Sequence, residues 1–318
     1  MVWREDIDPH HEPHKILIHK DVLIDPAREN RKIPYKIYYP VAHSLEHLPV
    51  IIWSHGLGGS RDGAAFLARY IASHGYVLIN IQHAGTDTSL WEGKPGHPWD
   101  VIRAAKITRE DSLNRFYDVP FLLDQLPEIA KSKEEIGSHI NLDVIGMSGH
   151  SFGALTSQVI TGQLFPDSSD KLSSIKDPRV KAGILYSFNP IDHLSDEDPS
   201  AVYGDMSVPL FFMTGTEDSS PINGKDYKYR MPVYDHAGSK EKYLLILNDG
   251  DHMVFAGSRG KLEDNPKRHK HEEIIKVCSL AFWDAHLKED KLAKAWLTDG
   301  EAISYLMSEA ELEVKSNE

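Results

Sequence analysis

A short turn, Gly149-His150-Ser151-Phe152-Gly153, stands between an apolar run over 140–147 and a segment of helical spacing over 151–163. A strand that leads directly into a helix turns sharply, and the two glycines remove the Cβ atoms that would collide there. The serine hydroxyl then lies beside the first N–H groups of the helix, which have no intrahelical partner and stabilise negative charge. The turn therefore predicts a nucleophilic serine held between a strand and a helix.

The rest of the chain alternates short apolar runs with segments of helical spacing. Buried strands are predicted at 49–53, 76–81, 142–147, 180–188, 208–214 and 242–247. Alternation of strands and helices requires crossover connections and a parallel sheet. Two further runs, 14–24 and 31–39, predict an antiparallel pair. We expect an α/β fold of the α/β-hydrolase kind, with a mostly parallel doubly wound sheet, an antiparallel N-terminal start and helices on both faces.

No repeat or linker divides the 318 residues, so a single domain is expected over 15–318. Residues 1–14 are polar and contain two prolines, and they predict a flexible N-terminal arm. The segment 82–106 shows neither helical nor strand periodicity. A loop of this length after a strand is usually functional, and we expect it to form part of a substrate site. The alternative is that its tryptophans, Trp91 and Trp99, only pin it to the body.

Charge and composition exclude several classes of protein. The chain has 48 acidic and 35 basic side chains, a net charge of −13 that argues against a nucleic-acid partner. No apolar run approaches the roughly 18 residues of a membrane span. The single cysteine, Cys278, allows no intrachain disulfide. The first fifteen residues lack the apolar centre of a signal peptide, so the cytoplasm is expected, although a secreted protein without its leader would look the same.

A serine hydroxyl becomes a good nucleophile when a base lies within hydrogen-bond reach and a carboxylate orients that base. In α/β-hydrolases both partners follow the serine in the chain and lie on loops after strands. His252 stands just past one buried run and is the expected base for Ser151. Asp218 follows the preceding run and is the preferred acid, while Glu217 and Asp192 remain alternatives.

Acyl transfer passes through an intermediate with a negatively charged oxygen, which N–H donors stabilise. The N–H of Phe152, directly after the nucleophile, is the first expected donor. Leu57, which lies between glycines in His55-Gly56-Leu57-Gly58, is the second. The residues expected to contact substrate are Gly56, His150 and Trp91. The eighteen histidines include no His-Glu-x-x-His pattern or comparable cluster, so neither a metal nor another cofactor is expected.

Four motifs carry a resemblance to a known family. They are His55-Gly56-Leu57-Gly58-Gly59-Ser60-Arg61, Gln82-His83-Ala84-Gly85-Thr86-Asp87, Arg115-Phe116-Tyr117-Asp118 and Gly149-His150-Ser151-Phe152-Gly153-Ala154. Over most of residues 31–290 the chain resembles α/β-hydrolases grouped with the platelet-activating-factor acetylhydrolases and predicted dienelactone hydrolases. The resemblance implies a serine carboxylesterase without metal or organic cofactor.

The chain departs from this family pattern at two positions. Dienelactone hydrolases proper carry a cysteine nucleophile, whereas this chain has Ser151 at the turn. The animal platelet-activating-factor enzymes carry their acid at the end of the strand after the elbow helix. This chain has Ser187 at the matching position, so Asp218 is expected to serve instead.

These patterns predict a carboxylesterase that hydrolyses compact esters, short-chain or aryl, through an acyl-enzyme intermediate. A polyester or lipid-ester hydrolase of the same mechanism is one alternative, because Trp91, Trp99 and Phe152 offer rings on which a substrate can stack. A non-catalytic binding protein on this fold is another, although such proteins tend to lose a member of the triad. The sequence makes no prediction of oligomeric state.

Overall fold

The computed structural model describes residues 2–41, 45, 47–132, 140–191, 194–257 and 265–316. In these ranges one sheet has the strand order β1-β2-β4-β3-β5-β8-β9-β10-β11. Its strands are β1 Ile16–Asp25, β2 Arg31–Pro40, β3 Leu48–Ser54, β4 Val77–Ile81, β5 Ile140–His150, β8 Val180–Tyr186, β9 Leu210–Glu217, β10 Glu241–Asp251 and β11 Ala310–Ser316. A separate small hairpin consists of β6 Phe165–Pro166 and β7 Leu172–Ser173.

The sheet is parallel in its centre and antiparallel at its ends. All neighbours from β4 through β10 pair in parallel, whereas β1 with β2, β2 with β4, and β10 with β11 pair antiparallel. Side chains of β3 alternate between two apolar layers, with Ile51 and Trp53 in one and Val50 and Ile52 in the other. A strand buried on both faces in this way reads as a continuous apolar run, which is why these strands were predictable.

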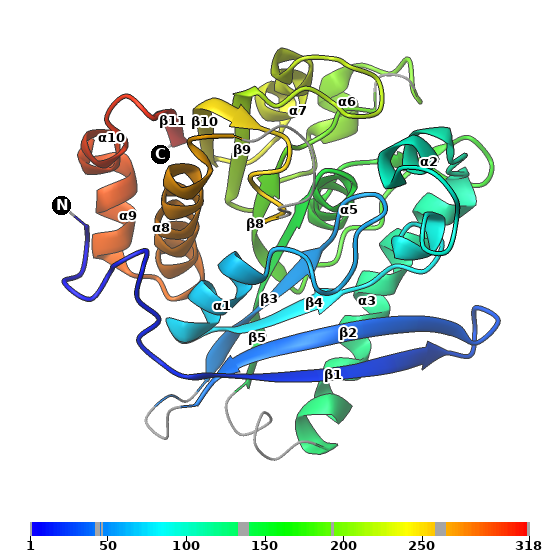
Figure 1. Cartoon of the computed structure of the whole chain (residues 1–318), viewed down its shortest axis with the longest axis horizontal. Helices are drawn as coiled ribbons and strands as arrows, with labels where there is room; N and C mark the ends of the chain where they lie inside the picture. The colour runs from blue at the N-terminus through cyan, green and yellow to red at the C-terminus, as the bar shows by residue number, and fades with distance from the viewer. Residues whose placement is uncertain are drawn as a thin grey trace.

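Helices cover both faces of the sheet (Figure 1). One face packs against α1 Ala65–Ser73, α8 Arg268–Leu287, α9 Lys291–Thr298 and α10 Glu301–Leu306. The other face packs against α3 Arg109–Ser132 and α5 Phe152–Thr161, with α6 Pro199–Tyr203 and α7 Met231–His236 beyond them. The predicted α/β-hydrolase fold class, including its antiparallel start, is therefore confirmed. No helix in the described ranges is both long and apolar enough to cross a bilayer.

The N-terminal segment was expected to be a flexible arm, but residues 2–14 lie against the body of the molecule. Trp3 and Ile7 are buried, with 8% and 7% of their surface exposed. The indole N–H of Trp3 donates to Asp284 Oδ2 on α8 at 3.2 Å, and Arg4 forms an ion pair with the same oxygen. Two apolar side chains four residues apart thus anchor a segment that is otherwise mostly polar.

The segment 82–106, predicted to lack regular structure, contains two short helices. They are the 3-10 turn η1 Thr88–Leu90 and the helix α2 Pro98–Ala104. Each is started by a local cap: the Asp87 carboxylate accepts from the N–H of Ser89, and the His97 ring accepts from the N–H of Trp99. Capping of this kind supports one or two turns without the apolar periodicity that identifies longer helices.

Candidate active site

Ser151 lies at the sharp turn between β5 and α5. Its backbone has φ 56° and ψ −116°, a conformation that costs a residue with a side chain about 1–3 kcal/mol. A Cβ on Gly149 would collide with the backbone of Gly153, and a Cβ on Gly153 would collide with the carbonyl of Ser54. The strained turn therefore requires both glycines, and it places the serine at the carboxyl edge of the parallel sheet.

His252 and Asp218 are brought together by the ends of two neighbouring strands. Asp218 follows β9 and His252 follows β10, and these strands are parallel, so their carboxyl ends lie side by side. Nδ1 of His252 is 2.7 Å from Oδ1 of Asp218. The carboxylate only accepts, so Nδ1–H is the donor and Nε2 is left unprotonated in the neutral ring. Thr214 donates to the other oxygen, Oδ2, at 2.8 Å.

The two alternative acids differ from Asp218 in their placement. Glu217 is the last residue of β9 and its side chain is exposed, whereas Asp218 is fully buried. Asp192 lies outside the described residues. Within the described ranges, Asp218 is thus the candidate acid that contacts His252.

Arg230 also binds Asp218, and no pattern in the sequence indicated it. It ends the 3-10 turn η2 Tyr227–Arg230, twelve residues after Asp218 in the chain, and its side chain is 1% exposed. Its Nη2 donates to Asp218 Oδ1 at 2.8 Å and lies 3.4 Å from His252 Nδ1. Burial would raise the pKa of Asp218, but Arg230 and His252 together bring it down to about 2. The carboxylate therefore stays ionised through the neutral range.

Ser151 and His252 line a cavity of about 760 Å³. No hydrogen bond joins Ser151 Oγ to His252 Nε2 in this structure; such bonds commonly tighten only when substrate binds. The apolar part of the wall comes from Phe66, Trp91, Trp99, Ile102, Ile222 and Met253. Gly56, His150 and Trp91, the residues expected to contact substrate, all line this cavity.

The segment 82–106 both forms a wall of the cavity and is fixed to the body. Trp91, Trp99 and Ile102 face the cavity, and the indole N–H of Trp91 donates to the carbonyl of Gly58 at 2.7 Å. The two alternatives for this segment are therefore compatible, since the same tryptophan pins the loop and lines the cavity.

His150 supports the turn that carries His252. Its Nε2–H donates to the carbonyl of His252 at 2.8 Å. Burial, reinforced by the neighbouring His252, lowers the pKa of His150 to about 3. His150 is therefore neutral at physiological pH and holds its proton on Nε2, where it positions the turn.

Leu57 and Phe152, the two expected oxyanion donors, lie on the two segments that flank Ser151. Phe152 is the first residue of α5, so its N–H has no partner inside the helix. Leu57 belongs to the loop 55–60, which lines the cavity and which we call the oxyanion loop after its expected role. In the described part of the chain no acceptor is bound to the N–H of Leu57, whereas the next residue, Gly58, donates to the carbonyl of Thr86 at 2.9 Å. Neither N–H group is therefore bound to a backbone acceptor in the described part of the chain.

The described residues contain no group of three or more His, Cys, Asp or Glu side chains placed to hold a metal ion.

Comparisons with known proteins point to one family. The model of the family "Platelet-activating factor acetylhydrolase, isoform II" matches residues 18–91, from β1 through the oxyanion loop to Trp91. The platelet-activating factor acetylhydrolase of dog (Canis lupus familiaris) is 23% identical over 290 residues, covering 79% of this chain and 60% of the relative. Those of guinea pig (Cavia porcellus) and cattle (Bos taurus) are 23% and 24% identical, covering 83% and 80% of this chain. The matches span only 60–63% of these relatives' own length.

Proposed function

On the premise that this chain is a relative of the platelet-activating factor acetylhydrolases, we propose that it is a serine hydrolase of carboxylic esters. The observation that carries the proposal is the buried His252–Asp218 pair, bonded at 2.7 Å, whose histidine lines the cavity together with Ser151. A strained nucleophile turn beside an oriented imidazole is the arrangement that acyl transfer requires. A non-catalytic binding protein has no need of either feature.

In the proposed reaction Ser151 Oγ attacks the ester carbonyl while its proton passes to Nε2 of His252. Asp218 holds the imidazole in the correct tautomer and stabilises the imidazolium that forms. The N–H groups of Leu57 and Phe152 donate to the oxyanion of the tetrahedral intermediate. The imidazolium then protonates the leaving alcohol, and the acyl group remains on the serine. A water molecule, deprotonated by His252, attacks this acyl-enzyme and releases the carboxylic acid.

The cavity wall favours esters with an apolar acyl or aryl part. Trp91 and Trp99 offer flat faces on which rings or methylene groups pack. We propose compact esters, short-chain or aryl, as substrates. The volume of about 760 Å³ exceeds what a short acyl chain fills, and this favours a lipid or polyester substrate of the same mechanism as the second candidate.

Hydrolysis of p-nitrophenyl acetate, butyrate and octanoate, combined with labelling by a fluorophosphonate, tests the function. We expect turnover that EDTA does not reduce, a single fluorophosphonate adduct on the peptide that contains Ser151, and a higher kcat/KM for butyrate than for octanoate. A higher kcat/KM for octanoate instead favours the lipid-ester candidate. Absence of both turnover and adduct contradicts the proposed function, and loss of turnover with EDTA would indicate a metal-dependent enzyme.

The charge of Arg230 is expected to set the acid limb of the pH profile. The charged or titratable groups that face the His252 ring are Asp218, Arg230 and His150. Arg230→Met removes a positive charge 3.4 Å from Nδ1 and leaves Asp218 free to stabilise the imidazolium. With that charge gone, a positive charge at the active site is less disfavoured, so the acid limb of kcat/KM should move to higher pH. Arg230→Lys retains the charge and is the matched control.

The Arg230 variants should be compared at equal concentrations of active sites, counted by fluorophosphonate titration, because loss of a buried arginine also lowers stability. An acid limb at the wild-type pH in Arg230→Met would show that the guanidinium has only a structural role.

A further inference from the structure

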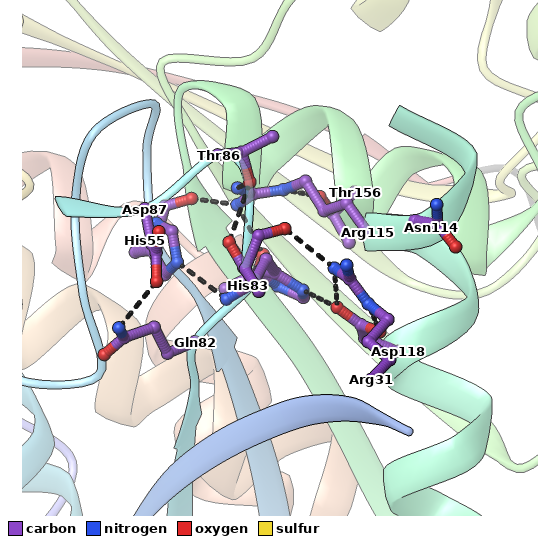
Figure 2. Close-up of polar contacts among 12 residues, drawn as sticks. Arg31, His55, Gln82, His83, Thr86, Asp87, Asn114, Arg115, Asp118 and Thr156 are labelled. Carbon is purple, nitrogen blue, oxygen red and sulfur yellow. Dashed lines mark hydrogen bonds and ion pairs between the residues drawn. The ribbon is translucent and has the colours of Figure 1, made fainter. Parts of the chain in front are cut away.

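A buried polar network lies behind the oxyanion loop, and the proposed mechanism does not use it (Figure 2). It joins Ser54 and His55 at the start of the loop to His83, Arg115 and Asp118. All five side chains are buried, and four of them have no exposed surface. Burying a polar group costs free energy unless the group is hydrogen-bonded. The hydrogen bonds among these five side chains therefore fix their relative orientation.

Asp118, His83 and Ser54 form a relay with the connectivity of a catalytic triad. Nδ1 of His83 is 3.0 Å from Asp118 Oδ2, and Nε2 is 2.9 Å from Ser54 Oγ. Burial raises the pKa of Asp118, and this is opposed by Arg31, which binds both oxygens at 2.7 and 2.8 Å, and by Arg28. Both oxygens of Asp118 thus accept hydrogen bonds, and one of them faces Nδ1 of His83. Nδ1 therefore carries the proton, and Nε2 accepts from the Ser54 hydroxyl. Ser54 is fully buried and does not line the cavity that contains Ser151, so a substrate in that cavity does not contact the Ser54 hydroxyl.

The relay continues into the oxyanion loop through His55. The backbone N–H of His83 donates to Nε2 of His55 at 3.1 Å. The proton of His55 therefore lies on Nδ1, which donates to the carbonyl of Gly56 at 2.7 Å. Burial, together with Arg115 and His83, lowers the pKa of His55 well below its usual value, so the ring is neutral. Each ring nitrogen of His55 thus makes one hydrogen bond. The bond from Nδ1 holds the carbonyl of Gly56, the residue before Leu57.

Arg115, on α3, binds the oxyanion loop from the other side. One Nη2–H donates to Ser54 Oγ at 2.9 Å, and Nη2 also donates to the carbonyl of His55. Nη1 donates to Thr86 Oγ1 at 2.9 Å, and the carbonyl of Thr86 accepts from Gly58. His55, before Leu57, is thus bonded to the guanidinium directly, and Gly58, after Leu57, is connected to it through Thr86.

The same guanidinium also holds the helix that supplies the second donor. Nε of Arg115 donates to Thr156 Oγ1 on α5 at 2.7 Å, and the guanidinium carbon lies 4.5 Å from the centre of the Phe152 ring. Figure 2 shows Arg115 placed between Thr86 and Thr156. Among the described residues no carboxylate forms an ion pair with Arg115; neutral oxygens accept its hydrogen bonds. These hydrogen bonds fix the orientation of the Arg115 guanidinium but do not neutralise its charge.

We propose that Arg115 is a positioning residue that fixes the N–H groups of Leu57 and Phe152 relative to each other, and that the Asp118–His83–Ser54 relay keeps it oriented. An oxyanion donor is effective only when it lies about 2.7–3.1 Å from the developing charge. The two donors belong to separate segments, and Arg115 is bonded to both of those segments. The inference rests on the proposed ester hydrolysis, because it assigns Arg115 a role in that reaction.

Arg115→Met tests the proposal, with Arg179→Met as the matched control. Arg179 is a half-buried arginine that pairs with Asp124 of α3 and does not line the active-site cavity. For p-nitrophenyl butyrate we expect Arg115→Met to lower kcat about 10²-fold and to change KM less than about 3-fold, because donor placement matters most in the transition state. The Ki of a trifluoromethyl ketone, whose adduct with serine carries an oxyanion, should rise by the same factor as kcat/KM falls.

Two milder variants keep the test decisive if Arg115→Met does not fold. Thr156→Val and Ser54→Ala each remove one hydroxyl that accepts from Arg115. Each should lower kcat and raise the ketone Ki on the order of 3- to 10-fold. The inference is overturned if folded Arg115→Met has the wild-type kcat and Ki, or if only its KM changes. If Arg115→Met does not fold, wild-type kcat and Ki in both milder variants overturn it. Failure of the function itself is distinguishable, since wild type would then neither hydrolyse esters nor take up fluorophosphonate.

Discussion

Replacing Ser151 by alanine is expected to lower kcat/KM for p-nitrophenyl butyrate by about 10⁵- to 10⁶-fold. The variant loses the only atom to which the acyl group is transferred, while the oxyanion donors and the cavity remain. A small residual rate above that in water is therefore expected from the N–H groups of Leu57 and Phe152. Fluorophosphonate labelling of the peptide that contains residue 151 should disappear completely, which mass spectrometry of the digested protein measures directly.

A serine outside the cavity provides the control for Ser151→Ala. Ser200, in α6, does not line the cavity, and Ser200→Ala should retain the wild-type kcat/KM and labelling. Circular dichroism and the melting temperature show whether both variants are folded. Alanine keeps the Cβ, and with it the backbone strain at this position, so the free energy of unfolding of Ser151→Ala should lie within about 1 kcal/mol of that of the wild type. Wild-type activity in a folded Ser151→Ala variant would rule out the serine mechanism.

The central sheet was predictable because its strands are buried on both faces. Continuous apolar runs such as the one in β3 leave little doubt about where a strand lies, and the helices between them require parallel pairing. β11 was not predicted, since Ala310–Ser316 alternates charged and apolar residues on an exposed edge of the sheet. Its identity as a strand depends on pairing with β10, a contact between segments more than sixty residues apart.

The residues of the candidate site fall into two groups: those that the sequence predicted and those that it did not. Ser151, Asp218 and His252 were singled out because each stands at the end of a strand, and in a parallel sheet those ends meet at one edge. Arg230 and Arg115 carry no such signal. Arg115 contacts Ser54, 61 residues before it, and Thr156, 41 residues after it. Nothing in the local sequence of any one of these segments specifies the contact, which arises only when α3 packs beside α5 and the oxyanion loop.

Asp218→Asn is expected to lower kcat/KM on the order of 10⁴-fold. The asparagine amide no longer acts as a pure acceptor toward Nδ1–H, so the imidazole loses its fixed tautomer and the charge that stabilises the imidazolium. The pKa of Asp218 is about 2, so its carboxylate is charged throughout the assay range and Asp218 itself contributes no acid limb above pH 4 in the wild-type profile. The loss should therefore be of similar size at every pH from 6 to 9.

Glu217→Gln and Asp192→Asn are the controls that assign the acid. Glu217 is exposed and adjacent to Asp218 in the chain, so its neutralisation alters the surface charge next to the site and leaves the bond to His252 intact. We expect both control variants to retain kcat/KM within about 3-fold of wild type, because neither substitution removes the carboxylate of Asp218 from His252. A 10⁴-fold loss in either control, with Asp218→Asn still active, would transfer the role of the acid to that residue. The ion pair between Asp218 and Arg230 would then have a role in stability and none in catalysis.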